Sequence, residues 1–183
     1  MIIGITGTNG AGKGTVVEYL VQKGFAHYSV RAFLITEIER RRLPVDRSSM
    51  RDVANDLRRQ HGPEYFDKIF LAEAKEKGQQ NIIIESVRTI GSARYLKEQG
   101  AVLLSVDANR HIRYDRVTKR ASHTDKVDFD TWVKEEEREW HNEAAHDMNV
   151  PGVMQMADYT LHNDGTVEEL YAQIDAVLSK LRT

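Results

Sequence analysis

The sequence contains no cysteine among its 183 residues. The chain can therefore form no disulfide, no cysteine-ligated zinc site and no thiol nucleophile, which excludes the classes of protein that depend on them. Histidines do not indicate a zinc site either, since His141 and His146 are five residues apart and not the four that a helical ligand pair needs. The lack of cysteine also fits a reducing compartment.

Long hydrophobic runs are missing as well. The apolar N-terminal stretch covers residues 1–6 before a glycine turn, and it has neither the basic region nor the cleavage site of a signal peptide. No apolar run approaches the roughly 20 residues that a membrane-spanning helix needs. We therefore expect a cytoplasmic protein that does not enter a membrane.

An excess of charge of one sign is also absent, because 26 basic residues stand against 28 acidic ones and the formal net charge is -2. This balance argues against the broad basic surface of a nucleic-acid-binding protein. The expected partner is a small molecule, and local clusters of arginine are where it would bind. A monomer and a homodimer are both compatible with this composition.

Short apolar runs alternate with amphipathic segments of helical length, which is typical of an α/β protein with a parallel sheet and helices on both faces. The length fits one domain with a small insertion. The predicted strands are residues 2–6, 25–28, 81–86, 101–107 and 159–162, which form a five-stranded sheet. Helices are predicted at residues 13–23, 30–42, 48–61, 64–77, 92–99, 109–120, 129–145 and from 167 onward.

A glycine-rich turn joins the first predicted strand to the first predicted helix. Glycines let a backbone wrap around an anion, and the exposed N–H groups and the helix N-terminus supply positive potential. Lys13 adds a charge that can reach the outer phosphates, and the hydroxyl of Thr15 can bind Mg²⁺. A purely structural glycine turn would need neither side chain. The pattern predicts a site for ATP, or another nucleoside triphosphate, with Mg²⁺, formed by Thr8, Asn9, Gly10, Ala11, Gly12, Lys13, Gly14 and Thr15.

This loop resembles the loop of adenylate kinases, because Gly14 separates Lys13 from Thr15, whereas the strict pattern places the hydroxyl residue directly after the lysine. Asn9 stands where that family usually has proline. The resemblance implies the three-layer P-loop kinase fold and a single domain over residues 1–183. It also implies an acceptor-binding helical region at about 29–78 and a small lid at about 113–138.

The resemblance extends more weakly over nearly the whole chain. Residues 82–84 followed by Glu85-Ser86-Val87-Arg88-Thr89 resemble the family's strand that ends in Asp-Gly-x-Pro-Arg-Thr. The resemblance implies that Glu85 replaces the aspartate and, with Thr15, binds magnesium, partly through water, and that Arg88 contacts the acceptor phosphate. Because the family's glycine and proline are missing, we expect the backbone turn to differ.

Two other segments resemble parts of P-loop kinases. Residues 28–34 stand where the family's acceptor-binding helix begins, which makes Ser29 and Arg31 acceptor-binding candidates. Residues 157–166 resemble the closing segment of several P-loop kinases, dephospho-CoA kinases included, in which the turn lies against the nucleotide base. This implies a base contact for Asp164 and Gly165. The spacing as a whole is similar to a little-characterised archaeal group of adenylate-kinase-related proteins.

Arginines give a second signal, since phosphoryl transfer depends on positioning and on cations around the moving phosphoryl group. Arg113, Arg116 and Arg120 have the i, i+3, i+7 spacing of one helical face, and Arg138 follows a polar segment at 121–128. This predicts a lid that brings Arg116 and Arg120, and then Arg138, to the donor. Taken singly, each arginine could instead form a surface ion pair.

A second arginine-containing face lies in residues 45–62. Arg51, Asn55 and Arg58 have i, i+4, i+7 spacing, so they could together bind an anionic acceptor. A solvated helix face explains the same spacing equally well. Both interpretations stay open on the residues alone.

Two acceptor chemistries are compatible with these residues. A phosphate acceptor needs cations and no base, whereas a hydroxyl acceptor, as in dephospho-CoA or shikimate, benefits from a carboxylate. Hydroxyl kinases of this superfamily often have an aspartate just after the second strand, where this chain has Ser29-Val30-Arg31. This favours a nucleoside or deoxynucleoside monophosphate, although Glu85 could serve as a base. A P-loop NTPase that regulates a protein or RNA partner is a further alternative.

Overall fold

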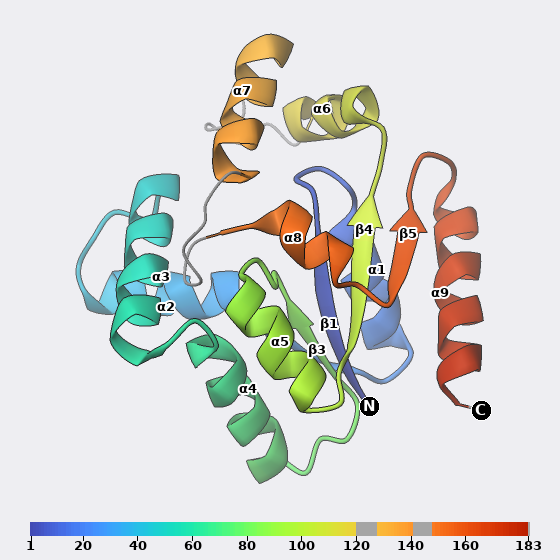
Figure 1. Cartoon of the computed structure of the whole chain (residues 1–183), viewed down its shortest axis with the longest axis horizontal. Helices are drawn as coiled ribbons and strands as arrows, with labels where there is room; N and C mark the ends of the chain where they lie inside the picture. Colours follow the sequence, from blue (N-terminus) through green and yellow to red (C-terminus); the bar gives the residue numbers. More distant parts are fainter. Residues whose placement is uncertain (120–127, 141–147, 183) are drawn as a thin grey trace.

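The computed structural model describes residues 1–119, 128–140 and 148–182, except for the side chains of Arg47, Glu135, Arg138 and Glu139. Its strands form one five-stranded sheet in the order β2-β3-β1-β4-β5, and every neighbouring pair is parallel. The fold is thus the expected three-layer α/β fold of P-loop kinases (Figure 1). The strands are β1 (Ile2–Gly7), β2 (Ala26–Ser29), β3 (Ile82–Glu85), β4 (Val102–Asp107) and β5 (Tyr159–His162).

Helices connect these strands and cover both faces of the sheet. Among the described residues, no helix is both long and apolar enough to cross a membrane. The helices are α1 (Lys13–Gln22), α2 (Val30–Arg40), α3 (Arg47–His61), α4 (Tyr65–Glu76), α5 (Ile90–Glu98), α6 (Arg110–Lys119), α7 (Phe129–Trp140), α8 (Val150–Gln155) and α9 (Val167–Leu181).

Helix α8 was not predicted, because a proline and a glycine lie within its six residues. The structure accommodates both. Pro151 lies in the first turn, where its missing N–H is not needed, and the side chain of Asn149 accepts a hydrogen bond from the Gly152 N–H at 2.9 Å. Two other helix starts differ slightly from expectation: Asp46 caps α3, and Thr89 caps α5.

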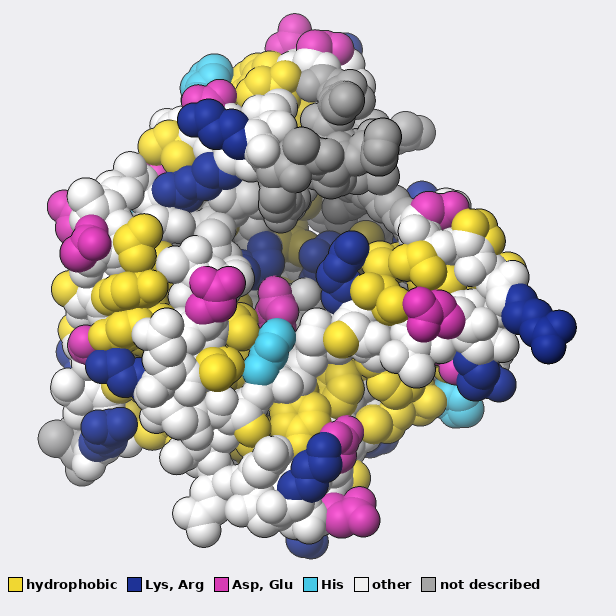
Figure 2. Space-filling view, turned by 180° about the vertical axis from the view of Figure 1, so that it is seen from behind, with side chains coloured by type: hydrophobic (Ala, Val, Ile, Leu, Met, Phe, Trp, Pro, Cys, Tyr) yellow, Lys and Arg dark blue, Asp and Glu magenta, His cyan; other side chains and the backbone are white. Residues whose placement is uncertain are grey.

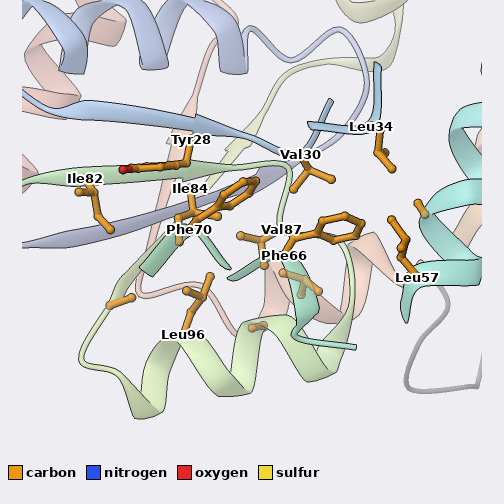
Figure 3. Close-up of a cluster of buried hydrophobic side chains, with 14 of the residues drawn as sticks. Tyr28, Val30, Leu34, Leu57, Phe66, Phe70, Ile82, Ile84, Val87 and Leu96 are labelled. Atoms are coloured by element: carbon orange, nitrogen blue, oxygen red, sulfur yellow. The ribbon is translucent and has the colours of Figure 1, made fainter. Parts of the chain in front are cut away.

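The side chains of each strand alternate between two hydrophobic layers. Ile83 of β3 is fully buried on the face that α1 and α9 cover, whereas Ile82 and Ile84 face α4, α5 and α8. On the second face, Phe66 and Phe70 of α4 pack beneath the sheet (Figure 3). Phe33 of α2 contacts the rings of Phe66 and Phe70 edge to face. Arg58 of α3 lies over the Phe66 ring, so these contacts join α2 and α3 to α4.

The parallel arrangement brings the carboxyl ends of all strands to one edge of the sheet, which is where α/β proteins bind ligands. The glycine-rich loop follows β1 at this edge. Glu85 ends β3, Asp107 ends β4, and the segment at 163–166 follows β5. The order of the strands therefore places polar side chains from distant parts of the sequence around the loop.

The two hydrophobic layers should carry most of the stability of the fold. Leu96→Ala removes a fully buried side chain of α5 and should lower the free energy of unfolding by roughly 2 to 5 kcal/mol. Val21→Ala, on α1, removes a side chain that is 45% exposed and should change it by less than about 0.5 kcal/mol. Urea unfolding measures both, and equal losses would contradict the assignment of the core.

Candidate nucleotide-binding and acceptor site

The glycine-rich loop has the backbone geometry of an anion-binding turn. Gly7, Gly10 and Gly12 all have left-handed backbone angles, with φ of 132°, 79° and 95°, which a residue with a Cβ adopts only with strain. Lys13 Nζ donates hydrogen bonds to the carbonyl oxygens of Gly7 (3.0 Å) and Thr8 (2.7 Å). The loop thus closes around the lysine at the N-terminus of α1.

Two residues that sequence reasoning missed support the loop from outside. The Thr8 hydroxyl donates to Asp107 Oδ1 at 2.7 Å, and the Asn163 side chain donates to the carbonyl oxygen of Ala11 at 2.8 Å. Asp107 ends β4, and Asn163 directly follows β5. Both residues could have been found from the sequence as polar residues at the carboxyl end of a predicted strand.

Glu85 lies at the carboxyl end of β3, where its Cα pairs with that of Ile5 in β1. His27 Nε2 lies 3.0 Å from Glu85 Oε2. The hydrogen bond from His27 holds the pKa of the Glu85 carboxyl below its usual value, and the charges of Lys13 and Arg88 act in the same direction, against the effect of burial. Glu85 is therefore ionised at neutral pH.

Thr15 and Glu85 carry a hydroxyl and a carboxylate, which are oxygen ligands of the kind that a magnesium ion accompanying a triphosphate takes. Mg²⁺ prefers oxygen ligands, keeps several water molecules, and takes further oxygens from the phosphates. In the part of the chain that the structure describes, there is no group of three or more acidic or histidine side chains that could hold a metal alone. An ion bound to a nucleotide needs fewer ligands from the protein, and one carboxylate and one hydroxyl are enough.

The turn after β3 keeps a backbone conformation that glycine favours, although no glycine is present. Ser86 has φ of 70°, which is strained for a residue with a side chain. Arg88 follows, and its carbonyl oxygen accepts a hydrogen bond from the Asn149 N–H at 2.8 Å. The missing glycine thus leaves strain at Ser86, and Asn149, the residue before α8, meets the loop that carries Arg88.

The other predicted acceptor residues are spread over α2 and α3. The Ser29 hydroxyl caps α2, and Arg31 is exposed, with a guanidinium nitrogen 3.4 Å from Met50 Sδ. Arg51 is exposed and pairs with its neighbour Asp52. Asn55 is half-buried. Of the predicted face on α3, Arg51 is therefore exposed and Asn55 is partly exposed.

Arg58 is the buried member of that face. Its guanidinium lies over the ring of Phe66, 5.2 Å from the centroid, and its charge acts on the buried carboxyl of Asp67. Asp67 also shares a hydrogen bond with Ser92, in the first turn of α5. Burial raises the pKa of Asp67 to about 6. This polar cluster joins α3 and α4 to the helix that follows Arg88.

The predicted lid arginines have different environments. Arg113 is buried and forms an ion pair with Glu136 of α7, so it does not face a substrate site. Arg116 is half-buried, and one of its guanidinium nitrogens lies 3.5 Å from Asn163 Oδ1. Arg120, the side chain of Arg138 and residues 121–127 of the polar segment lie outside the described residues. Arg116 thus adjoins the loop through Asn163.

The turn after β5 lies beside the loop, because Asn163 in this turn donates a hydrogen bond to Ala11. A side-chain oxygen of Asp164 accepts a hydrogen bond from the N–H of Asn109, the last residue of the β4–α6 connection. Thr166 and Glu169 form a capping box for α9, and the carboxylate of Glu169 packs against Gly165, so a Cβ there would displace this carboxylate from the capping box. Asp164 and Gly165 therefore lie next to the β4–α6 connection, on the side of the loop where Arg116 lies.

Charged side chains surround a hollow on the face opposite to that of Figure 1. Basic, acidic and histidine side chains gather there near the centre of the molecule (Figure 2). A parallel sheet with this strand order, and with a lysine-bearing loop after its central strand, defines a nucleotide-binding protein of the P-loop kinase fold. A family model described as an AAA domain matches residues 3–148, and the chain therefore belongs to that family.

Related sequences align over nearly the whole chain. The UPF0200 protein TK1334 of Thermococcus kodakarensis is 28% identical and aligns with 99% of this chain and 100% of its own length. The UPF0200 protein PAE1629 of Pyrobaculum aerophilum is also 28% identical, over 99% of this chain and 98% of its own.

Among solved structures, TT1252 from Thermus thermophilus is similar, with a TM-score of 0.58, 23% identity and coverage of 99% and 97% of the two chains. Shikimate kinase from Bacteroides thetaiotaomicron follows with a TM-score of 0.56, 11% identity and coverage of 100% and 99%. At these identities the likeness concerns the fold.

The loop geometry predicts different effects for two neighbouring glycines. Gly12→Ala should lower the free energy of unfolding by roughly 1 to 3 kcal/mol, because φ is 95° and the new Cβ would collide with the side chain of Asn163. Gly14→Ala is the control, since no atom lies within 4 Å of its new Cβ. Thermal unfolding without nucleotide compares them, and a loss of similar size for Gly14→Ala would contradict this account.

The raised pKa of Asp67 predicts a dependence of stability on pH. A carboxyl group that binds its proton more tightly in the folded protein stabilises the fold fully below its unfolded pKa of 3.8, and this contribution is lost as the pH rises through about 6. Relative to Asp67→Asn, wild type should therefore lose roughly 2 to 3 kcal/mol between pH 4 and 7. Urea unfolding at several pH values tests this, and parallel curves would contradict it.

Proposed function

We propose that this protein is an ATP-dependent kinase that transfers the γ-phosphoryl group to the phosphate of a nucleoside or deoxynucleoside monophosphate. The observation that carries the proposal is the position of Glu85, whose carboxyl group is within electrostatic reach of both Lys13 and Arg88. Two cations, one on the phosphate loop and one after β3, thus act on the same carboxyl group. Phosphoryl transfer between two anions needs cations near both phosphates, which supports the proposal.

On the donor side, Lys13 and the N–H groups of the loop bind the β- and γ-phosphates. Thr15 and Glu85 hold Mg²⁺, partly through water, and this ion, when bound, neutralises charge on the phosphates. The base lies against Asp164 and Gly165. The lid, at about 113–138, brings cations to the moving phosphoryl group from Arg116, Arg120 and Arg138.

On the acceptor side, the helical region at about 29–78 and Arg88 bind the monophosphate. An acceptor phosphate oxygen attacks the γ-phosphorus while the bond to the β–γ bridging oxygen breaks, and ADP leaves. The attacking oxygen is already an anion, so no base is required. The residues proposed to bind the acceptor are Ser29, Arg31, Arg51, Asn55, Arg58 and Arg88.

A hydroxyl acceptor, as in a dephospho-CoA kinase, is the second candidate, because Glu85 could take a proton from a hydroxyl group. Its lowered pKa makes it a weak base, since a general base works best with a pKa near the working pH. The low pKa suits a carboxylate that stays ionised beside a metal ion. We therefore favour the phosphate acceptor.

The experiment is a panel of nucleoside and deoxynucleoside monophosphates, with dephospho-CoA and shikimate, in which ADP release from ATP and Mg²⁺ is measured. At least one monophosphate should be phosphorylated, and Lys13→Ala should abolish turnover. Arg88→Ala should lower kcat/KM for the monophosphate roughly 10²- to 10³-fold. Arg94→Ala, which removes an exposed arginine of α5, is the control and should not.

Two results would contradict the proposal. Phosphorylation of dephospho-CoA but of no monophosphate would identify a hydroxyl kinase. Hydrolysis of ATP without transfer to any acceptor, stimulated by a protein or RNA, would identify a regulatory NTPase.

A further inference from the structure

Arg113 has an environment that its sequence spacing did not indicate. It was expected on the same helical face as Arg116, but only 3% of its surface is exposed. Its guanidinium pairs with both carboxylate oxygens of Glu136, and the contact of NH2 with Oε2 measures 3.0 Å. It also lies over the ring of Trp132, 5.1 Å from the centroid. A buried ion pair thus joins α6 to α7.

The same guanidinium also binds the phosphate loop. Its NH1 donates to the carbonyl oxygen of Asn9 at 3.1 Å, and its Nε donates to the carbonyl oxygen of Ala108 at 3.0 Å. The next loop residue, Gly10, packs so tightly on α6 that a Cβ there would lie 2.6 Å from the carbonyl oxygen of Arg113. Helix α6 therefore supports the loop at two consecutive residues.

This support fixes the direction in which the loop presents its N–H groups. A peptide unit is planar and trans, so its carbonyl and its N–H point in opposite directions. Because Arg113 holds the Asn9 carbonyl toward α6, the N–H of Gly10 points away from α6. Asn163 holds the Ala11 carbonyl in the same way and so fixes the N–H of Gly12. N–H groups fixed in advance are what an anion-binding loop requires.

Glu136 is needed to keep the guanidinium in this place. It is 7% exposed and binds the guanidinium of Arg113 through both carboxylate oxygens. The other carboxylate near Arg113, that of Asp107, lies 3.9 Å from its Nε and accepts a hydrogen bond from Thr8. A buried guanidinium that loses its directly paired carboxylate is costly and tends to draw in water or withdraw to the surface. Its contact with Asn9 would then be lost.

We propose that Arg113 and Glu136 are positioning residues for the donor, so that the affinity for the triphosphate depends on a carboxylate of α7 that does not touch the nucleotide. The inference rests on nucleotide binding at the loop and not on the identity of the acceptor. Coupling between two sites is reciprocal. Bound ATP should therefore stabilise the packing of α7.

The test measures the Kd for ATP with Mg²⁺ by calorimetry, without acceptor. Glu136→Gln should weaken binding roughly tenfold, a typical size for such coupling. Glu137→Gln is the matched control, because Glu137 is the next residue and is exposed. Glu137 pairs with Arg110, whose guanidinium carbon lies 5.5 Å from the ring centroid of Trp140. It should change Kd by less than about twofold. Equal effects, or an unchanged Kd with a lower unfolding temperature in Glu136→Gln, would overturn the proposal.

A second measurement does not depend on the folding of any variant. Amide hydrogen exchange of wild-type protein should slow in residues 129–140 when ATP binds, and unchanged exchange there would overturn the proposal. Arg113→Lys keeps the charge but loses the planar set of donors, so it should weaken ATP binding as Glu136→Gln does. A protein that binds ATP in this way but phosphorylates no monophosphate would refute the proposed function and leave this inference intact.

Discussion

The direction of a few peptide units in the phosphate loop is the constraint on which the site depends. A triphosphate can be bound by backbone N–H groups only if the carbonyls of the same peptide units point elsewhere and find donors there. Left-handed glycines make these directions accessible, and Lys13, Arg113 and Asn163 supply the donors. The lysine thus has a structural role within the loop besides its charge. A helix outside the loop therefore helps to set the direction of its N–H groups.

The loop and the sheet could be predicted from the sequence because both depend on local patterns. Alternating apolar runs indicated five strands, and a glycine-rich turn before a helix indicated the phosphate site. Where prediction failed, the cause was either an unusual local compensation or a contact between distant segments. Helix α8 belongs to the first kind, since Asn149 and Pro151 offset its poor helix composition.

Arg113 belongs to the second kind. Helical spacing shows which residues share a face, but it does not show what that face meets. Glu136 lies in a run of three glutamates that in sequence resembles a solvated surface, and only the packing of α7 on α6 buries it. The roles of Asp107 and Asn163 depend in the same way on strand order, which no single segment specifies.

The register of the sheet has a consequence for substrate choice. Glu85 of β3 pairs with Ile5 of β1 on one side and with Ser29 of β2 on the other. The donor loop and the start of α2 are therefore separated by two interstrand spacings, about 10 Å, with β3 alone between them. Under the proposed function, an acceptor anchored at the start of α2 would have to span this fixed distance with its own length and the side chains that hold it, because the sheet does not shorten it.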